Sequence, residues 1–149
     1  MTDLLHQARS NRIPCVLVCV TDQFSCERLV SAGAEIARRR GLALQVMSVQ
    51  GLSLDGRNAE ALDHLFNVSR SFGAEMTVFY DKEPSRSFIK YVKRFHTSDI
   101  VAGVSDVRNS PFYLTIKRYN ERKPKRKMLL HIVSKTGDVK SYDAVEELL

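Results

Sequence analysis

Short apolar segments alternate along the chain with longer segments in which apolar residues recur every three or four positions. The first apolar segment, within residues 13–23 (IPCVLVCVTDQ), has no polar side chain on either face before Thr21. A strand that is apolar on both faces has to be covered on both faces, which is typical of a parallel sheet between two layers of helices. We therefore predict a central strand here, ending in Thr21, Asp22 and Gln23.

The rest of the pattern predicts four more strands in alternation with four helices. The strands are expected at residues 42–49, 75–80, 99–103 and 128–133, and the helices at about 24–40, 62–72, 84–95 and 111–122. Gly41 and Gly73 each follow a helix and precede a strand by a few residues, which is typical of repeated right-handed βαβ units. The order of elements predicts a doubly wound α/β fold with a five-stranded, mainly parallel sheet and helices on both faces.

This pattern fills residues 13–149, which we predict to form a single domain after a polar lead-in at residues 1–12. A small C-terminal extension follows the fifth strand. Residues 135–138 (KTGD) predict a turn, and Asp143 with Glu146 three positions later predicts the capping box of a last short helix.

Polar residues stand where four of the predicted strands end. These positions are residues 21–23, Gln50 with Gly51, Asp81 with Lys82, and residues 103–106. Ligands of such sheets bind beyond the carboxyl ends of the strands, so this edge is the first place to look for a binding site.

Composition excludes several classes of protein. No apolar run approaches the roughly 20 residues that cross a bilayer, and no apolar core of a signal peptide stands near the start, so we expect a cytoplasmic protein without a membrane partner. Cys15, Cys19 and Cys26 form neither an even set nor a metal-binding spacing, so no metal site is predicted. Cys15 and Cys19 are expected on one face of the strand, in the core.

Signatures of enzymes are also missing: the chain contains no GxSxG, HExxH, GxxxxGK[ST] or GxGxxG motif. His131 lies inside an apolar strand, where a packed, hydrogen-bonded histidine is expected rather than a catalytic base. We name no catalytic residue from the sequence.

The net charge of +6 is confined to one stretch, residues 117–127 (KRYNERKPKRK), so that the rest of the chain is neutral overall. Cations gather naturally at the end of a helix, and a charged loop is usually a solvated face. The alternative is a polyanion-binding patch, for which we favour an acidic protein partner over nucleic acid. The basic residues of this patch are Lys117, Arg118, Arg122, Lys123, Lys125, Arg126 and Lys127.

The segment VLVCVTDQ, the strand-end Gly103, the strand-closing Val49 and the order of elements together resemble the universal stress protein family, the adenine-nucleotide α-hydrolase-like variant of this fold. The resemblance covers about residues 13–133. In its first half the chain is especially similar to the stress-protein-like module of potassium-sensing histidine kinases.

The resemblance implies a site for ATP or another adenine nucleotide, with magnesium if ATP is bound, and it implies that Asp22 lies near the ribose and the metal. The family's phosphate loop reads Gly, two residues, Gly, nine residues, Gly, then Ser or Thr. With Gly103 as the first glycine, the later positions fall on Asp106, Ile116 and Lys117, so the loop is broken. The nucleotide-binding residues expected on this basis are Thr21, Asp22, Gln23, Val49, Gly103, Ser105 and Ser110.

Simpler interpretations exist for two of these residues. Asp22 is equally suited to cap the helix that follows it, and Ser110 to cap the helix that opens at Pro111. Most of the aromatic residues are expected to belong to the core stripes of the helices.

Three functional hypotheses follow. The first is a non-catalytic regulatory or stress-response domain with a degenerate nucleotide site, acting through a protein partner or through a homodimer joined at the last strand, from Met128 to Val133. The second is a sensor that still binds an adenine nucleotide or dinucleotide at the strand ends. The third is a polyanion or nucleic-acid binder that uses the basic stretch.

Overall fold

The structure is a computed structural model that describes residues 13–52, 58–103 and 111–142, without the side chains of residues 111–113. Its centre is a six-stranded sheet in the order β3-β2-β1-β4-β5-β6. The strands are β1 (Cys15–Cys19), β2 (Ala43–Gln50), β3 (Glu75–Tyr80), β4 (Thr97–Gly103), β5 (Leu129–Val133) and β6 (Val139–Tyr142). The helices are α2 (Glu27–Arg40), α3 (Ala59–Ser71), α4 (Pro84–Arg94) and α5 (Pro111–Arg122), with short 3₁₀ helices η1 (Phe24–Cys26) and η3 (Pro124–Arg126).

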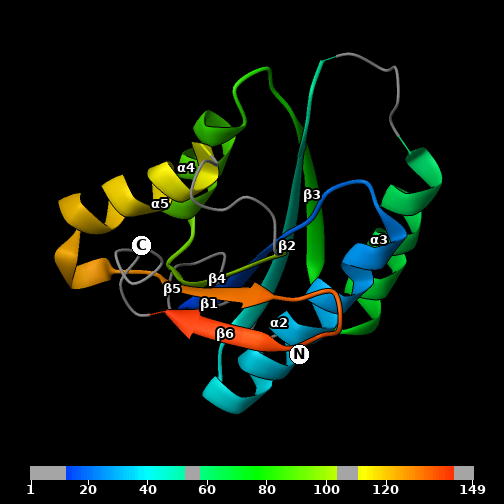
Figure 1. Cartoon of the computed structure of the whole chain (residues 1–149), viewed down its shortest axis with the longest axis horizontal. Helices are drawn as coiled ribbons and strands as arrows, with labels where there is room; N and C mark the ends of the chain where they lie inside the picture. Colours follow the sequence, from blue (N-terminus) through cyan, green and yellow to red (C-terminus); the bar gives the residue numbers. More distant parts are fainter. Residues whose placement is uncertain (1–12, 53–57, 104–110, 143–149) are drawn as a thin grey trace.

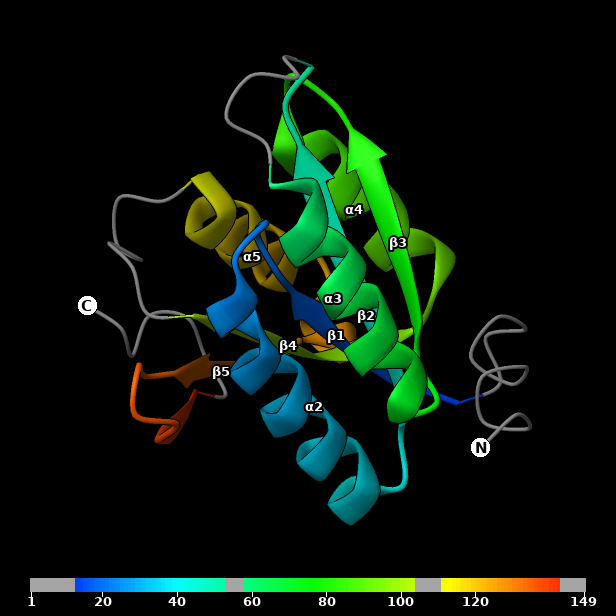
Figure 2. The same cartoon turned by 90° about the vertical axis from the view of Figure 1, so that its right-hand side faces the viewer.

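Helices cover the sheet on both faces. Figure 1 shows α4 and α5 on one side of the strands and α2 and α3 on the other, and the turned view of Figure 2 agrees. The first five strands run parallel to one another, as the sequence predicts. The α/β class and the two helix layers are thereby confirmed.

The central strand β1 explains why both layers are needed. Val16, Leu17 and Val18 are completely buried, although successive side chains of a strand point to opposite faces. Leu17 belongs to the core under α4 and α5, whereas Val16 and Val18 belong to the core under α2 and α3. Cys15 and Cys19 lie on the Leu17 side, which confirms the prediction that they share a face.

Two helix ends follow the predicted chemistry. Gly41 is the C-cap of α2 with φ of 66°, and Gly73 after α3 has φ of 76°, both in the left-handed region that glycine enters without steric cost. Pro84 opens α4, where its missing N–H costs no hydrogen bond. These residues mark the boundaries of helices, so the start of the following element can be predicted to within a few residues.

The prediction of five strands is wrong, because a sixth strand pairs with β5. Residues 134–138 form a tight turn in which the N–H of Ser134 donates to the carbonyl of Asp138 at 2.8 Å, and Gly137 adopts φ of 92°. The chain then returns as β6, antiparallel to β5, with Ile132 opposite Lys140. The strand was missed because its residues (VKSY) are mostly exposed and carry no apolar pattern. The helix predicted from Asp143 and Glu146 lies outside the described residues.

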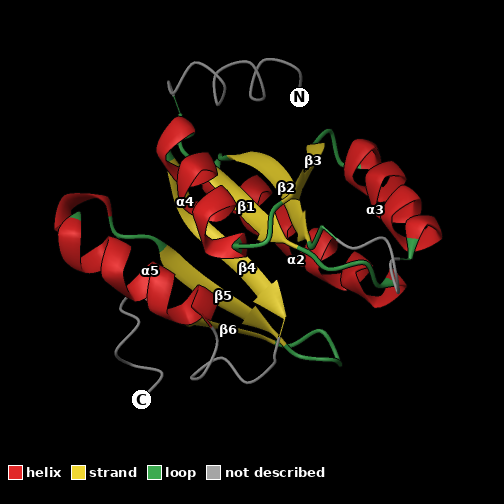
Figure 3. Cartoon of the chain, turned by 90° about the horizontal axis from the view of Figure 1, so that it is seen from above, coloured by secondary structure: helices red, strands yellow, loops and turns green. Residues whose placement is uncertain are grey.

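The position of β6 also bears on the predicted homodimer. The strand that was expected to pair with a second copy has β4 on one side and β6 on the other. Its backbone is therefore engaged on both edges within one chain, and the two outer strands of the sheet are β3 and β6. Figure 3, which looks at the molecule from above, shows β6 lying along the outer side of β5.

Helix α2 lies close against the sheet at Gly33. A Cβ atom at this position would lie 2.3 Å from Cγ2 of Val18 and 3.3 Å from Cδ1 of Leu44, both in the core. The first distance is far inside van der Waals contact. A side chain at this position would therefore push the helix away from β1.

We predict that Gly33→Ala lowers the free energy of unfolding by about 1–3 kcal/mol, because the overpacking of Val18 outweighs the better helix propensity of alanine. Urea unfolding monitored by circular dichroism measures the change. Gly51→Ala is the matched control, since a Cβ there meets no atom within 4 Å, and its effect should stay within about 0.5 kcal/mol. Equal stability of Gly33→Ala and the wild type would contradict the close approach.

Candidate functional site

The carboxyl ends of the parallel strands meet along one edge of the sheet. The N–H of Val20 donates to the carbonyl of Met47 at 2.9 Å, and the N–H of Asp81 donates to the carbonyl of Gln50 at 2.9 Å, so neighbouring strands stay in register to their ends. Thr21–Gln23, Gln50, Asp81 and Gly103 thus lie along this common edge. We refer to it below as the strand-end edge.

Asp22 does not cap the helix that follows it. The N-cap position of η1 is Gln23, whose side chain makes no capping hydrogen bond. Instead, Oδ2 of Asp22 accepts a hydrogen bond of 2.7 Å from the backbone N–H of Asn58. Asn58 is itself the N-cap of α3, where its side chain accepts from the N–H of Ala61. Asp22 therefore connects the end of β1 to the start of α3.

Of the other predicted nucleotide-binding residues, some have defined positions in the structure and two do not. The hydroxyl of Thr21 is 3.4 Å from the sulfur of Cys26. Val49 pairs with Phe79 of β3 and packs against the core on the α4 and α5 side. Gly103 ends β4 opposite Val133. Ser105 and Ser110 lie outside the described residues.

Arg28, which the sequence analysis missed, brings a positive charge to this edge. Its Nε donates to the carbonyl of Ser134 at 2.9 Å, and its Nη1 donates to the carbonyl of Ser25 at 2.7 Å. The third nitrogen, Nη2, lies 3.5 Å from the place where a Cβ of Gly103 would stand. A guanidinium group is thus held over the glycine at the end of β4. Nothing in the spacing of α2 distinguishes Arg28 from a solvated helix residue.

Asp81 at the end of β3 organises the start of α4. Its carboxylate accepts from Nη2 of Arg86 at 2.7 Å, from the hydroxyl of Ser87 at 2.8 Å and from the N–H of Glu83 at 2.9 Å. The hydrogen bond from Arg86 is the largest cause that holds the pKa of this carboxyl well below its usual range, followed by those from Glu83 and Ser87. Asp81 is therefore a negatively charged anchor for α4.

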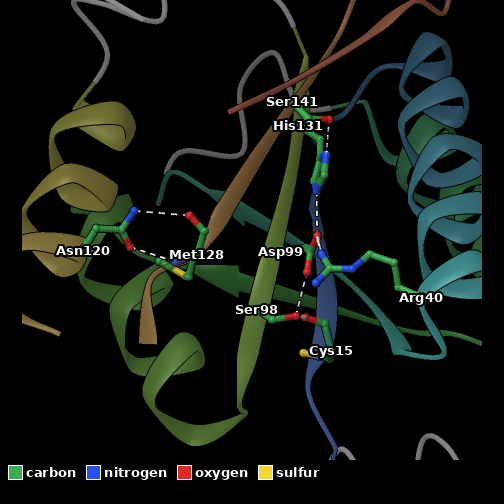
Figure 4. Close-up of polar contacts among 8 residues, drawn as sticks. All are labelled: Cys15, Arg40, Ser98, Asp99, Asn120, Met128, His131 and Ser141. Atoms are coloured by element: carbon green, nitrogen blue, oxygen red, sulfur yellow. Dashed lines mark hydrogen bonds and ion pairs between the residues drawn. The ribbon is translucent and has the colours of Figure 1, made fainter. Parts of the chain in front are cut away.

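A second polar cluster surrounds Asp99, whose side chain is completely buried in β4 (Figure 4). Nη1 of Arg40, at the end of α2, donates to Oδ2 of this carboxylate. Oδ1 accepts from the hydroxyl of Ser98 at 2.7 Å. Nε2 of His131 on β5 lies 2.6 Å from Oδ2, and its Nδ1 lies 2.7 Å from the hydroxyl of Ser141 on β6. One buried charge thus joins α2 and three strands.

The order serine, histidine, aspartate occurs in catalytic triads, but the contacts of this cluster favour a structural role. Both oxygens of Asp99 are already bonded, one of them to Arg40 as well as to His131. Ser141 stands directly opposite His131 in the register of an edge strand, so their contact is a cross-strand pair. The expectation of a packed, hydrogen-bonded His131 is confirmed.

The thiols of the central strand are protonated at neutral pH. Burial raises the pKa of Cys15 to about 11, and burial also raises the pKa of Cys19 far above its usual value. Within residues 13–52, 58–103 and 111–142, no group of three His, Cys, Asp or Glu side chains is placed to hold a metal ion. No helix in the same ranges is long and apolar enough to cross a membrane.

Asn120 of α5 joins the two ends of the loop that carries most of the basic stretch. The side chain of this residue donates to the carbonyl of Met128 at 3.2 Å and accepts from its N–H at 2.9 Å, as Figure 4 shows. Residues 121–127, between these two anchors, are all exposed. Lys117, Arg118 and Arg122 belong to α5, whereas the other basic residues of the stretch lie in or beside η3: Lys123, Lys125, Arg126 and Lys127.

The overall fold can be compared with solved structures. Universal stress protein UspA from Lactobacillus plantarum superposes with a TM-score of 0.53 and 17% identity, over 82% of this chain and 97% of that one. The chain has the fold of the universal stress proteins. Lower TM-scores are found for the universal stress protein from Archaeoglobus fulgidus (0.48, 22% identity, 66% of this chain and 80% of that one) and for a universal stress protein in complex with cAMP (0.49, 16% identity, 81% and 97%).

At the level of sequence, no protein-family model and no curated protein matches the chain. The likeness to universal stress proteins therefore concerns the fold. The closer similarity to the module of potassium-sensing histidine kinases stays a prediction.

We predict that Asp99→Asn lowers the free energy of unfolding at neutral pH by about 2 kcal/mol, because Arg40 and His131 lose a buried charged partner. The variant should also respond less to acid. Burial raises the pKa of Asp99, but the hydrogen bonds from His131 and Ser98 and the charge of Arg40 outweigh burial, so the folded pKa is lowered. A carboxyl with a lowered folded pKa stabilises the protein above its unfolded pKa of about 3.9 and loses this contribution as the pH falls through the folded value.

Urea unfolding between about pH 7 and pH 2.5 tests this prediction. The wild type should lose more stability than Asp99→Asn across the acid range. Asp63→Asn, on the exposed side of α3, is the matched control and should follow the wild type. Parallel curves for the wild type and Asp99→Asn would show that the buried carboxylate is not linked to stability.

Proposed function

We propose that the protein is a non-catalytic regulatory domain that binds an adenine nucleotide at the strand-end edge, with Arg28 supplying the charge that faces the phosphates. The observation that carries the proposal is the guanidinium of Arg28 held over Gly103 at the end of β4. The fold supports it, because parallel α/β sheets bind ligands at this edge. The choice of an adenine nucleotide rests on the resemblance to the universal stress proteins.

Arg28 offers a physical substitute for the broken glycine loop. A glycine loop binds phosphates with backbone N–H groups that no Cβ obstructs, whereas an arginine presents a planar fork that matches two phosphate oxygens. Two of the three guanidinium nitrogens of Arg28 are held by the carbonyls of Ser25 and Ser134. A side chain that is already positioned loses little conformational entropy when a ligand arrives.

The contact between Asp22 and Asn58 suggests how binding would be transmitted. The carboxylate of Asp22 accepts the N–H of the residue that caps α3. A ribose or a phosphate-bound magnesium ion that competes for this carboxylate would weaken its hold on the start of α3. The output of such a regulatory domain would then be the position of α3 rather than a chemical step.

Magnesium would arrive bound to the phosphates. Mg²⁺ in nucleotide sites is usually held by one or two carboxylates together with phosphate oxygens and water. Of the two aspartates that the structure describes at the ends of β1 and β3, Asp22 fits this role, since Asp81 is occupied by the start of α4.

The homodimer implied by the resemblance remains a proposal in a modified form. Because β5 is paired with β6, a second copy would add to β6 or would have to displace it. A contact of the basic stretch with an acidic protein is compatible with either arrangement.

Isothermal calorimetry with ATP, AMP, cAMP and adenosine tests the nucleotide site. We predict that Arg28→Gln weakens ATP binding about tenfold and leaves adenosine binding unchanged, because only ATP carries phosphates. Arg39→Gln, near the far end of the same helix, removes the same charge and should bind both ligands like the wild type. Arg28→Lys, which keeps the charge but not the fork, should fall between.

Two outcomes would contradict the proposal. Absence of binding for all four compounds at millimolar concentration would exclude an adenine-nucleotide site. Equal ATP affinity of Arg28→Gln and the wild type would show that the phosphates do not lie on Arg28. Thermal unfolding of each variant controls for the loss of the contacts from Arg28 to Ser25 and Ser134.

A further inference from the structure

A groove of about 670 Å³ runs between α4 and α5 and reaches the strand-end edge at Arg86, which pairs with Asp81. The two helices lie side by side on the same face of the sheet (Figures 1 and 3). The groove is lined by one face of each helix, with residues at positions 85, 86, 89, 90 and 93 of α4 and 115, 118, 119 and 122 of α5. Its half-buried neutral residues include Ile89 and Tyr119, whereas its charged residues are exposed.

All charged residues that line the groove are positive. They are Arg86, Lys90 and Lys93 from α4, and Arg118, Arg122 and Lys123 from α5 and the residue after it. Only the second group stands out in the sequence, because the first is spread over a helix with no run of basic residues. The fold brings the two groups to opposite sides of one hollow.

Most of these charges have no neutralising partner among the residues that the structure describes. Arg86 pairs with Asp81 at 2.7 Å and approaches Glu83 at 3.8 Å. In the part of the chain that the structure describes, the other five cations have no ion-pair partner. Like charges three or four positions apart on a helix repel one another, and this spacing occurs on both helices, between Lys90 and Lys93 and between Arg118 and Arg122. An anion between the helices would relieve this repulsion.

The dimensions of the groove favour a small and highly charged ligand. From Arg86 to Lys93 the cations of α4 extend over roughly 10 Å, at 1.5 Å per residue. The volume lies within the range of about 300–1,000 Å³ that is usual for small-molecule sites. At the Arg86 end, the carboxylates of Asp81 and Glu83 lie beside the cations of the groove.

Single-stranded nucleic acid fits these features less well. Proteins that bind it combine a longer basic track, covering at least about four nucleotides, with several aromatic side chains on which successive bases stack. Tyr119 is the one aromatic residue among those that line the groove, and it is half-buried. An acidic peptide spaces its charges along a chain, whereas linked phosphoryl groups concentrate several negative charges within a length comparable to the groove.

We propose that the α4 and α5 groove is a binding site for a small polyphosphate, a compound that carries three or more linked phosphoryl groups. Lys90 and Lys93 would contact the phosphoryl oxygens from one side, and Arg118 and Arg122 from the other. This site shares no residue with the nucleotide site proposed around Asp22, Gly103 and Arg28, and it does not depend on that site.

Calorimetry with inorganic tripolyphosphate tests the proposal, because this probe has no base or ribose. The wild type should bind one equivalent, with an affinity that falls as the salt concentration rises. The combined change Lys90→Ser, Lys93→Ser and Arg122→Ser should weaken binding by at least about 30-fold. Each lost cation is expected to cost about tenfold in affinity, and the effects of neighbouring residues do not add fully. Because all three side chains are exposed, the variant should remain folded, which circular dichroism verifies.

The matched control removes the same charge outside the groove. The combined change Lys125→Ser, Arg126→Ser and Lys127→Ser affects three exposed residues that do not line the groove, and it should alter affinity by less than about threefold. An equal loss in both triple variants would show that the probe responds to overall charge, which would overturn the proposal. Absence of saturable binding to the wild type would overturn it as well.

Three further measurements separate the alternatives. The amide resonances of Ile89 and Tyr119 should shift on addition of tripolyphosphate in nitrogen-15 NMR spectra, and shifts confined to other regions would contradict the site. A mixed-sequence single-stranded 20-mer or polyglutamate could bind more tightly than tripolyphosphate and lose affinity in the groove variant. This result would overturn the polyphosphate proposal, and the ligand would be a nucleic acid or an acidic protein instead. Arg28→Gln should bind tripolyphosphate at the groove like the wild type, so failure of the nucleotide proposal and failure of this one are distinguishable.

Discussion

The complete burial of β1 on both faces is the constraint on which the rest of the structure depends. Val16 and Val18 need α2 and α3 on one face of the sheet, and Leu17 needs α4 and α5 on the other (Figure 1). The connections between the strands therefore have to run over both faces. Parallel strands connected in this way leave all their carboxyl ends at one edge. The edge along which Asp22, Gly103 and Arg28 lie is therefore a consequence of how the centre of the sheet is covered. The same arrangement lays α4 and α5 side by side and forms the basic groove between them.

A buried charge complements this apolar centre. Asp99 would be costly to bury alone, and it is accommodated because Arg40, Ser98 and His131 all bond to it. These partners come from the end of α2, from β4 and from β5, so the carboxylate fixes the relative positions of segments that are distant in sequence. Ser141 extends the network to β6 through His131. The polar cluster thus gives the sheet a specific arrangement that apolar packing alone would leave less well defined.

Most elements of the fold could be predicted from the sequence, because the signals that define them are local. The apolar run of β1, the left-handed Gly41 and the helix-opening Pro84 each act within a few residues. β6 could not be predicted, because it is stabilised by its partner strand and its side chains are mostly exposed. The common edge of the strand ends could be predicted from the order of elements, whereas ligand binding at this edge stays a prediction. The expected role of Asp22 as a cap of the next helix is wrong, because the N-cap is Gln23. The roles of Arg28, Arg40 and the cations of α4 depend on residues that are distant in sequence, and the periodicity of apolar positions does not indicate such contacts.

The pairing of β6 with β5 also affects how the molecule behaves toward copies of itself. An apolar strand with a free edge offers a row of unpaired N–H and carbonyl groups, which is a template for aggregation. Here the chain covers that edge of β5 with a four-residue strand, in which Lys140 stands opposite Ile132. A short, mostly exposed and partly charged outer strand is a poor template for further addition. The hairpin therefore shields the edge of β5 within the chain itself.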